Sequence, residues 1–299
     1  MTDAVLEADG IAKRFTAGFA LRDVSFTVRA GELFGLGGHR GSGRTTAVRV
    51  AAGVLPADSG RVRWRSAPID PATRRRIGYL PATTGLYPEL TVLDQLVHRA
   101  ELHGFDTNEG HRRAQVWLDR LSMRSLRDRR TATLNADERR LVALLATLLP
   151  DPELLLLDEP FTGASRTGVG TMVELLRDQA AAGVPVLLSG NDLDQIEQYC
   201  DRAAILRNGQ IMASGTVAEL VAGGPRLFRV DAPDAEPGWG DTVPGCRTVD
   251  ADGSRLLVEV AADADEQAVL HAALASGPVR EFTRVRRTLA DLFDPAGLS

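Results

Sequence analysis

The chain has 299 residues, of which 44% are hydrophobic and 25% are charged, and its formal net charge is −5. This length allows one large domain and one small one, and the acidic balance argues against general nucleic-acid binding. Two cysteines are too few for a disulfide framework. We find no apolar run long enough to span a bilayer and no signal-peptide pattern in the polar N-terminus, so we expect a cytoplasmic protein.

The first part of the chain predicts two antiparallel strands. Residues 5–8 and 24–28 alternate apolar and polar side chains, as strands with one buried face do. Phe15 precedes the second of these strands. Its ring would either stack on a base or pack in the interior, and the sequence does not decide between the two.

Residues 33–50, LFGLGGHRGSGRTTAVRV, predict a buried strand, a glycine-rich turn and a helix that continues to residue 54. The spacing is that of the phosphate loop G-x-x-x-x-G-K-[ST], with Arg44 in place of lysine. Glycines let backbone N–H groups turn inward around phosphate oxygens, and the following helix directs its positive end to the same anion. We predict a nucleotide-phosphate site formed by Gly38, His39, Arg40, Gly41, Ser42, Gly43, Arg44, Thr45 and Thr46. The Thr45 hydroxyl would bind Mg²⁺; a glycine-rich turn without ligand is the alternative.

The middle of the chain changes from strands to helices. Short strands are expected at residues 61–64 and 77–80. Residues of about 83–150 then predict a helical insertion. Its helices are expected at residues 92–102, 112–126 and 141–149, the last of which ends before Pro150.

Residues 154–159, LLLLDE, give the second strong signal. Four consecutive leucines favour a parallel strand that is buried on both faces, and acids at its carboxyl end lie where open α/β sheets bind ligands. Asp158 would hold Mg²⁺, and Glu159 would orient or deprotonate a water that attacks the γ-phosphate. Ordinary solvated acids are the alternative. Alternating helices and strands follow, at residues 173–182, 184–188, 193–199 and 203–206, and Asn208-Gly209 predicts a hairpin to residues 211–213.

Gly223-Gly224-Pro225 predicts a linker, so we divide the chain into domains at residues 1–222 and 225–299. The second domain predicts a small α+β unit. Its strands are expected at 227–230, around the turn Asp252-Gly253 and at 280–285, and its helices at 266–275 and 289–293. Nothing in it carries obvious chemistry, and we expect a packing or regulatory module.

The order of these motifs over residues 4–222 closely resembles that of the ATP-binding subunits of ABC transporters. Segments 279–285 and 288–293 are similar to the tail of daunorubicin-type drug exporters, which pair with a separate ABC-2 type membrane subunit. The resemblance implies an α/β fold with a P-loop NTPase (ABC ATPase) core, an antiparallel β subdomain, a helical subdomain and a small α+β C-terminal domain. It also implies ATP and Mg²⁺ as ligands, a second nucleotide-binding domain in a homo- or heterodimer, and a place on the inner face of the membrane through the permease.

Several positions depart from this family pattern. The signature LSGGQ falls on 134–138, which is LNADE here, so Asp137 and Glu138 place negative charge where the partner's γ-phosphate is expected. Acids at a helix start also suit the helix dipole, so a structural role is the alternative. The Q-loop glutamine falls at Ala82, the D-loop aspartate at Ser165 and the switch histidine at Asn191. Asparagine can donate a hydrogen bond to the γ-phosphate but cannot take up a proton near neutral pH.

We therefore expect the ATP-binding subunit of an ABC-2 type exporter, with Glu159 and Asn191 in the catalytic positions. Its motifs are degenerate, so it would be weakly hydrolysing or inactive alone, and the sequence leaves open whether it is an enzyme. Two alternatives remain: an ordinary ATP-hydrolysing transport motor, and a structural or regulatory partner that works without nucleotide.

Overall fold

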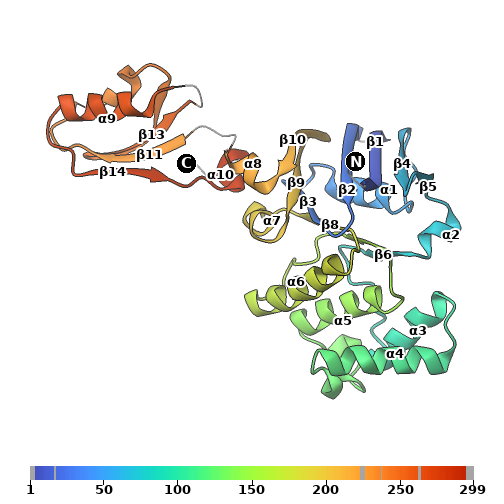
Figure 1. The fold of residues 1–299 in the computed structure, drawn as a ribbon. Coiled ribbons are helices and arrows are strands. Elements are labelled where there is room, and N and C mark those ends of the chain that lie inside the picture. The colour runs from blue at the N-terminus through green and yellow to red at the C-terminus, as the bar shows by residue number, and fades with distance from the viewer. Residues whose placement is uncertain (1–3, 17, 223–225, 237, 262–263, 294–299) are drawn as a thin grey trace. The chain divides into compact units, whose positions relative to one another are not determined.

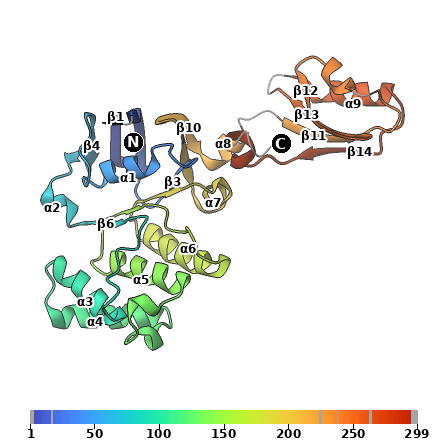
Figure 2. The ribbon, with the colours of Figure 1, turned by 180° about the vertical axis from the view of Figure 1, so that it is seen from behind.

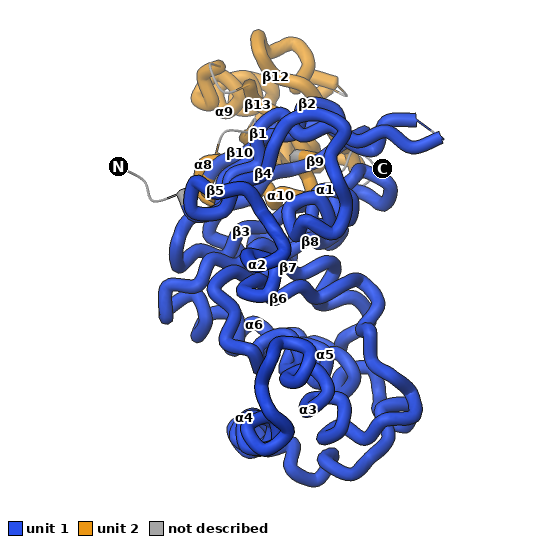
Figure 3. Tube along the Cα trace, turned by 90° about the vertical axis from the view of Figure 1, so that its right-hand side faces the viewer, with its two compact units in different colours: residues 1–215 blue, residues 216–299 orange. Residues whose placement is uncertain are grey.

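The computed structural model describes residues 4–16, 18–222, 226–236, 238–261 and 264–293. The chain divides into two compact units, Met1–Gly215 and Thr216–Ser299 (Figure 3). The short helix α8 (Val217–Ala222), which the domain prediction placed in the first domain, therefore belongs to the second unit. The predicted linker at 223–225 lies outside the described residues.

Unit 1 is built around a six-stranded sheet with the order β10-β9-β3-β8-β7-β6. Its strands are β3 (Leu33–Gly38), β6 (Ile77–Leu80), β7 (Leu154–Leu157), β8 (Val186–Gly190), β9 (Arg202–Arg207) and β10 (Gln210–Thr216). Strand β3 pairs in parallel with β8 and β9, and β7 pairs in parallel with β6 and β8. All residues of β3 and β7 are buried, which explains their unbroken apolar sequences. The carboxyl ends of β3, β6, β7 and β8 consequently meet at one edge.

Helices cover both faces of this sheet. Helix α1 (Arg44–Ala51) packs in one hydrophobic cluster with Phe34 and Leu36 of β3. On the other face, a Cβ atom at Gly35 would lie 2.7 Å from Ile196 Cγ2 of α7 (Leu193–Tyr199), so glycine permits this close packing. Helix α6 (Arg166–Ala181) also contacts β3 and β8. Helix α1 ends at Ala51 rather than at the predicted residue 54, and α6 begins at Arg166 rather than at the predicted residue 173.

A second sheet in unit 1 has the order β2-β1-β4-β5. It consists of β1 (Ala4–Phe15), β2 (Gly18–Arg29), β4 (Ser59–Trp64) and β5 (Ala67–Pro68). The predicted antiparallel pair is confirmed, but β1 extends to Phe15. The sequence prediction stopped early because register shifts, for example between Ala8 and Ile11, interrupt the alternation of apolar and polar residues.

The predicted helical insertion is confirmed. The segment between β6 and β7 contains α3 (Val92–Leu102), α4 (Thr107–Arg120), the 3₁₀ turns η1 (Arg124–Leu126) and η2 (Thr131–Thr133), and α5 (Ala136–Leu148). Figures 1 and 3 show α3 and α4 at the end of unit 1 opposite to β1, β2 and β4. The short helix α2 (Pro71–Arg74) precedes β6. Helix α4 differs most from its prediction: it starts after the cap Asp106 and ends before Ser122, whose φ of 55° is left-handed.

Unit 2 is an α+β module with its own core, as predicted. After α8 it contains β11 (Arg226–Asp231), η3 (Trp239–Thr242), β12 (Cys246–Asp252), β13 (Arg255–Val260), α9 (Glu266–Ala275), β14 (Glu281–Val285) and α10 (Leu289–Phe293). The antiparallel sheet has the order β12-β13-β11-β14. Figure 2 shows α9 beside this sheet, and Val269 and Ala273 of α9 pack on Phe228 and Val258.

Within the described ranges, no helix combines the length and the apolar composition that crossing a bilayer requires.

Candidate functional site

The glycine-rich loop connects β3 to α1 through backbone that only glycine adopts without strain. Gly38 has a φ of 146°, and a Cβ atom there would lie 2.2 Å from the Leu206 carbonyl oxygen. Gly43, the N-cap of α1, has a φ of 106°, and its Cβ atom would lie 2.3 Å from the Ala20 carbonyl oxygen. Between them, the Ser42 amide donates to the His39 carbonyl oxygen over 3.1 Å, which closes the turn. His39, Arg40 and Gly41 of this loop are exposed, so a ligand can approach the loop just before the N-terminus of α1.

Asp158 and Thr45 meet below this loop, although 113 residues separate them. The Thr45 hydroxyl donates to Asp158 Oδ1 over 3.0 Å, and the Ser189 hydroxyl donates to the same oxygen over 2.8 Å. Asp158 is fully buried, and its Oδ2 has no hydrogen-bond partner among the described residues. A buried carboxylate oxygen without a donor, next to a hydroxyl, fits the oxygen ligands that Mg²⁺ takes. Thr45 and Asp158 are thus the residues that would hold the metal.

Glu159 lies against Arg44. The guanidinium Nη2 donates to Glu159 Oε1 over 3.2 Å, and only 4% of the Arg44 surface is exposed. Burial lowers the pKa of Arg44, while the negative charges of Glu159 and Asp158 oppose that change. The guanidinium stays charged at any ordinary pH. The predicted phosphate-binding cation is therefore paired with the predicted catalytic carboxylate.

Asn191 and Ala82 lie at the same sheet edge, whereas Phe15 lies at the end of β1 in the antiparallel sheet. Gly37 pairs with Gly190, so Asn191 follows β8 beside the end of β3, and its side chain is exposed. Leu80 pairs with Leu157, so Ala82 follows β6 beside Asp158. At the end of β1, Phe15 is 45% exposed, with Lys13 Nζ 5.9 Å from its ring centroid. The ring is therefore not buried in the core and has a face that a base could contact.

The segment at the signature position is held by contacts within the chain. Asn135 caps α5 and forms a capping box with Glu138, which also pairs with Arg129 over 3.0 Å. Asp137 accepts hydrogen bonds from the Ser165 hydroxyl and from the Ser165 amide, the latter over 2.7 Å, and these bonds lower the pKa of Asp137. Both acids therefore have structural partners, so the alternative reading of them as helix-start residues has direct support.

Sequence reasoning missed three residues that support the acidic pair. Ser189 donates to Asp158 and accepts from the Glu159 amide over 3.0 Å. The Thr162 hydroxyl donates to Glu159 Oε2 over 3.3 Å, and Arg140 Nε donates to the Thr162 carbonyl oxygen over 3.1 Å. Ser189 could have been found, because a hydroxyl near the carboxyl end of a central strand is a candidate ligand-edge residue. Thr162 and Arg140 carry no comparable signal.

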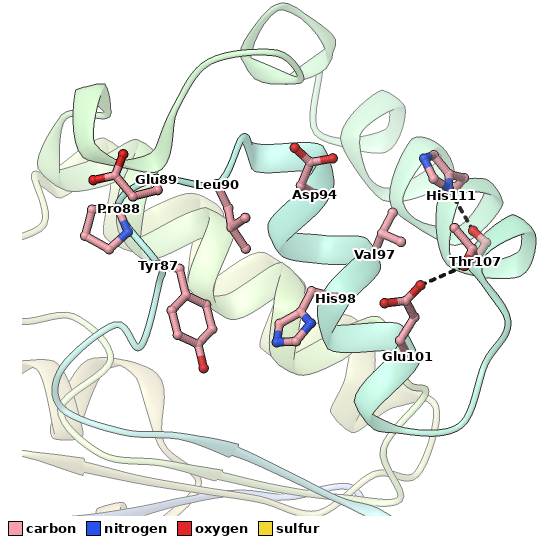
Figure 4. A pocket seen from close by; sticks show the side chains of 10 residues that line it. All are labelled: Tyr87, Pro88, Glu89, Leu90, Asp94, Val97, His98, Glu101, Thr107 and His111. Carbon is pink, nitrogen blue, oxygen red and sulfur yellow. Dashed lines mark hydrogen bonds between the residues drawn. The ribbon is translucent and has the colours of Figure 1, made fainter.

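A separate cavity of about 600 Å³ lies on the helical part (Figure 4). It is lined by residues of the loop before α3, of α3 and of α4, and none of the predicted site residues lines it. Several of its polar groups are already bonded: Thr107 donates to Glu101 over 2.7 Å, and His111 Nδ1 is 2.7 Å from the Thr107 carbonyl oxygen. Tyr87 and His98 form an edge-to-face contact with centroids 5.6 Å apart. This cavity is therefore distinct from the loop and acid cluster.

The fold defines a P-loop NTPase core, and comparison with known proteins identifies its family. Residues 21–162 match the ABC transporter family. YhaQ, an ABC transporter ATP-binding protein of Bacillus subtilis, is 30% identical over 216 residues, which are 72% of each chain. LptB, the lipopolysaccharide export system ATP-binding protein of Escherichia coli, is 30% identical over 224 residues, or 73% of this chain and 93% of LptB. A solved ATP-binding subunit of an ABC transporter gives a TM-score of 0.66 at 30% identity, covering 72% of this chain and 91% of that one.

The chain therefore belongs to the family of ABC transporter ATP-binding proteins, and it is an ATP-binding subunit of an ABC transporter. Members of this family bind ATP, typically with Mg²⁺, and they dimerise and pair with transmembrane permease subunits. The predicted fold class, an ABC ATPase core with antiparallel and helical parts, is confirmed.

Proposed function

We propose that this chain is the nucleotide-binding subunit of an ABC-2 type exporter, and that it binds Mg-ATP but hydrolyses it weakly or not at all alone. The observation that carries the nucleotide part is the contact of 3.0 Å between Thr45 and Asp158 at the end of the glycine-rich loop. Backbone amides of residues 38–46 would hold the phosphates, and Phe15 would stack on the base. Bound Mg²⁺ would neutralise phosphate charge, with Thr45 and Asp158 as its protein ligands.

The side chains at three positions around the predicted catalytic residue Glu159 support weak hydrolysis. Arg44 has a buried, planar guanidinium where the family places the compact ammonium of lysine. Ala82 has no polar group for the metal or the attacking water, and Asn191 has no titratable proton. Loss of one group that stabilises developing charge commonly costs about 10²–10³ in rate. Such losses overlap when the residues act together, so the individual factors are not multiplied. We expect very slow turnover.

The signature segment supports the same proposal for the partner's site. Ala136 and Asp137 stand where the signature glycines are expected, and Glu138 stands where its glutamine is expected. Asp137 is bonded to Ser165, and Glu138 is bonded to Asn135 and Arg129. A competent second nucleotide-binding domain would thus meet an altered surface here. A homodimer would contain two impaired sites. In a heterodimer both sites would also be affected, because one contains this chain's loop and the other receives this chain's signature segment.

The exporter assignment is supported by two resemblances. The tail similar to that of daunorubicin-type exporters corresponds to β14 and α10 of unit 2. The relative LptB belongs to a lipopolysaccharide export system. We accordingly propose an ABC-2 type permease as the membrane partner, a second nucleotide-binding domain in a homo- or heterodimer, and a cytoplasmic position on the inner face of the membrane.

The test is an ATP turnover assay of the purified chain with Mg²⁺, compared with Glu159→Gln. We expect slow turnover, and the exposed α6 variant Glu174→Gln should match the wild type. Brisk Mg²⁺-dependent turnover that Glu159→Gln abolishes would instead identify an ordinary transport motor. Complete absence of nucleotide binding, measured by calorimetry with ATP or ADP at millimolar concentration, would identify a structural or regulatory partner.

A further inference from the structure

Arg44 gives a ligand little access to its donors in the conformation that the structure shows, because only 4% of its surface is exposed. Its Nη2 is bonded to Glu159 Oε1 over 3.2 Å. Its Nε and Nη1 are buried, and among the described residues they have no hydrogen-bond partner. An incoming anion therefore finds Nη2 bonded to a carboxylate and both Nε and Nη1 buried. It can contact this guanidinium only after the side chain moves.

Glu159 is fixed in the position that engages Arg44. Its Oε2 accepts from the Thr162 hydroxyl over 3.3 Å, and its amide donates to the Ser189 hydroxyl over 3.0 Å. Its φ of 49° lies in the left-handed region, which residues with a Cβ atom adopt rarely and only where the surroundings impose it. The carboxylate therefore has Arg44 and Thr162 as partners, and the backbone that carries it is fixed by the bond to Ser189.

We propose that Glu159 competes with the nucleotide phosphates for Arg44. In the nucleotide-free chain, the ion pair with Glu159 keeps Arg44 from binding phosphate. The inference rests on the proposed nucleotide-binding function, in which position 44 of the loop faces the β- and γ-phosphates. Because its Nε and Nη1 are buried, the Arg44 guanidinium cannot keep its Nη2 bond to the carboxylate and also turn to a phosphate. Nucleotide binding must therefore break the pair, and the apparent affinity is reduced by the stability of the pair.

The pair itself is tested without nucleotide. Arg44→Gln, Glu159→Gln and the double variant are compared with the wild type by urea denaturation of the full chain, with circular dichroism to establish that each variant folds. We expect strong non-additivity, because the second substitution removes a group whose partner is already gone. If the two substitutions change the free energy of unfolding additively, Arg44 and Glu159 do not stabilise each other, and the proposed competition is overturned.

The competition is tested by calorimetric titration of the same four proteins with ADP at constant Mg²⁺. ADP cannot be hydrolysed to drive turnover, so the titration reports binding alone. We expect Glu159→Gln to tighten the Kd by about three- to tenfold, the range of a partly buried ion pair. In the Arg44→Gln background the same substitution should leave the Kd unchanged. Glu174→Gln, which removes one exposed carboxylate of α6, should bind as the wild type does.

The outcomes separate this inference from the proposed function. If ADP binds to the wild type and Glu159→Gln binds it no more tightly, competition is overturned while nucleotide binding stands. If Glu159→Gln lowers the Kd for ADP as much in the Arg44→Gln background as in the wild type, Glu159 acts by direct repulsion of phosphate. Competition for Arg44 is then overturned. If none of the proteins binds ADP, the proposed function and the competition both fail, whatever the denaturation cycle shows.

Discussion

Arg44 illustrates how one side chain changes the chemistry of a familiar loop. A lysine ammonium is a compact charge on a flexible stem, whereas a guanidinium is a planar fork that matches a carboxylate. Here the guanidinium forms an ion pair with Glu159, and Arg44 is almost completely buried. The sequence predicts the position of this cation from the loop spacing. It cannot predict the pairing, because the partner is 115 residues away and reaches Arg44 only through the sheet order.

The loop glycines provide a prediction at the level of single residues. Gly41 and Gly43 both have left-handed backbone, with φ of 79° and 106°, but only at Gly43 would a Cβ atom clash, 2.3 Å from the Ala20 carbonyl oxygen. We expect Gly43→Ala to lower the free energy of unfolding by about 3 kcal/mol or more, since strain and clash add, and Gly41→Ala by about 1 kcal/mol. Urea denaturation measures both. Equal losses in the two variants would show that the clash is relieved by local movement.

Helix centres were predicted better than helix starts. Helices α3, α7 and α9 match their predicted bounds, because their apolar spacing runs from end to end. Helices α5 and α6 begin earlier than predicted, since their first turns are polar and lack apolar periodicity. The caps Asn135 and Ser165 were readable signals, and Asn135 with Glu138 has capping-box spacing. The Asp137–Ser165 contact that joins these two helix starts could not be read, because it depends on their packing.

The cap of α5 provides a prediction at the level of one helix. The Asn135 side chain accepts from the Glu138 amide over 2.9 Å, and the Glu138 carboxylate accepts from the Asn135 amide over 2.9 Å. We expect Asn135→Ala to lower the free energy of unfolding by about 1 kcal/mol, because an N-cap acceptor is lost. Asn135→Ser keeps an acceptor and should retain most of the stability. If alanine and serine behave alike in urea denaturation, the side-chain cap contributes nothing.

The start of α4 provides a prediction about pH. Hydrogen bonds from Arg112 and Arg113 lower the pKa of Glu109 to about 2 from 4.5. A lowered carboxyl pKa stabilises the folded state above the unfolded value, and this contribution is lost as pH falls through the folded value. We therefore expect the Tm difference between wild type and Glu109→Gln to be largest at neutral pH and to shrink from pH 4.5 toward about 2. A difference that stays constant over this range would contradict the assignment.

At the scale of the molecule, the two units differ in how far the sequence explains them. Unit 1 has motifs whose spacing predicted the loop, the acids and their convergence, because parallel strands bring their carboxyl ends together. Unit 2 was predicted as an α+β module from its strand and helix patterns alone. Its role stays a proposal, since a packed core identifies a fold and not an activity.

The two cysteines provide a prediction for the units, since Cys200 lies in unit 1 and Cys246 in unit 2. Burial raises the pKa of Cys200 to about 12 from 9.0, so almost no reactive thiolate forms in the folded protein. Cys246 is only partly buried. We expect a thiol reagent to modify native Cys200 at least about tenfold more slowly than Cys246, because Cys200 requires opening of unit 1. Mass spectrometry of labelled peptides measures both rates. Similar rates in native protein would contradict the burial of Cys200.

The most direct test of the central claim is a calorimetric titration of the full chain with ATP, with and without Mg²⁺, in wild type and in Asp158→Asn. If the loop, Thr45 and Asp158 form one Mg-nucleotide site, the wild type binds ATP at millimolar or lower concentration, and Mg²⁺ tightens binding much more in the wild type than in Asp158→Asn. Absence of ATP binding to the wild type at millimolar ligand would contradict the claim.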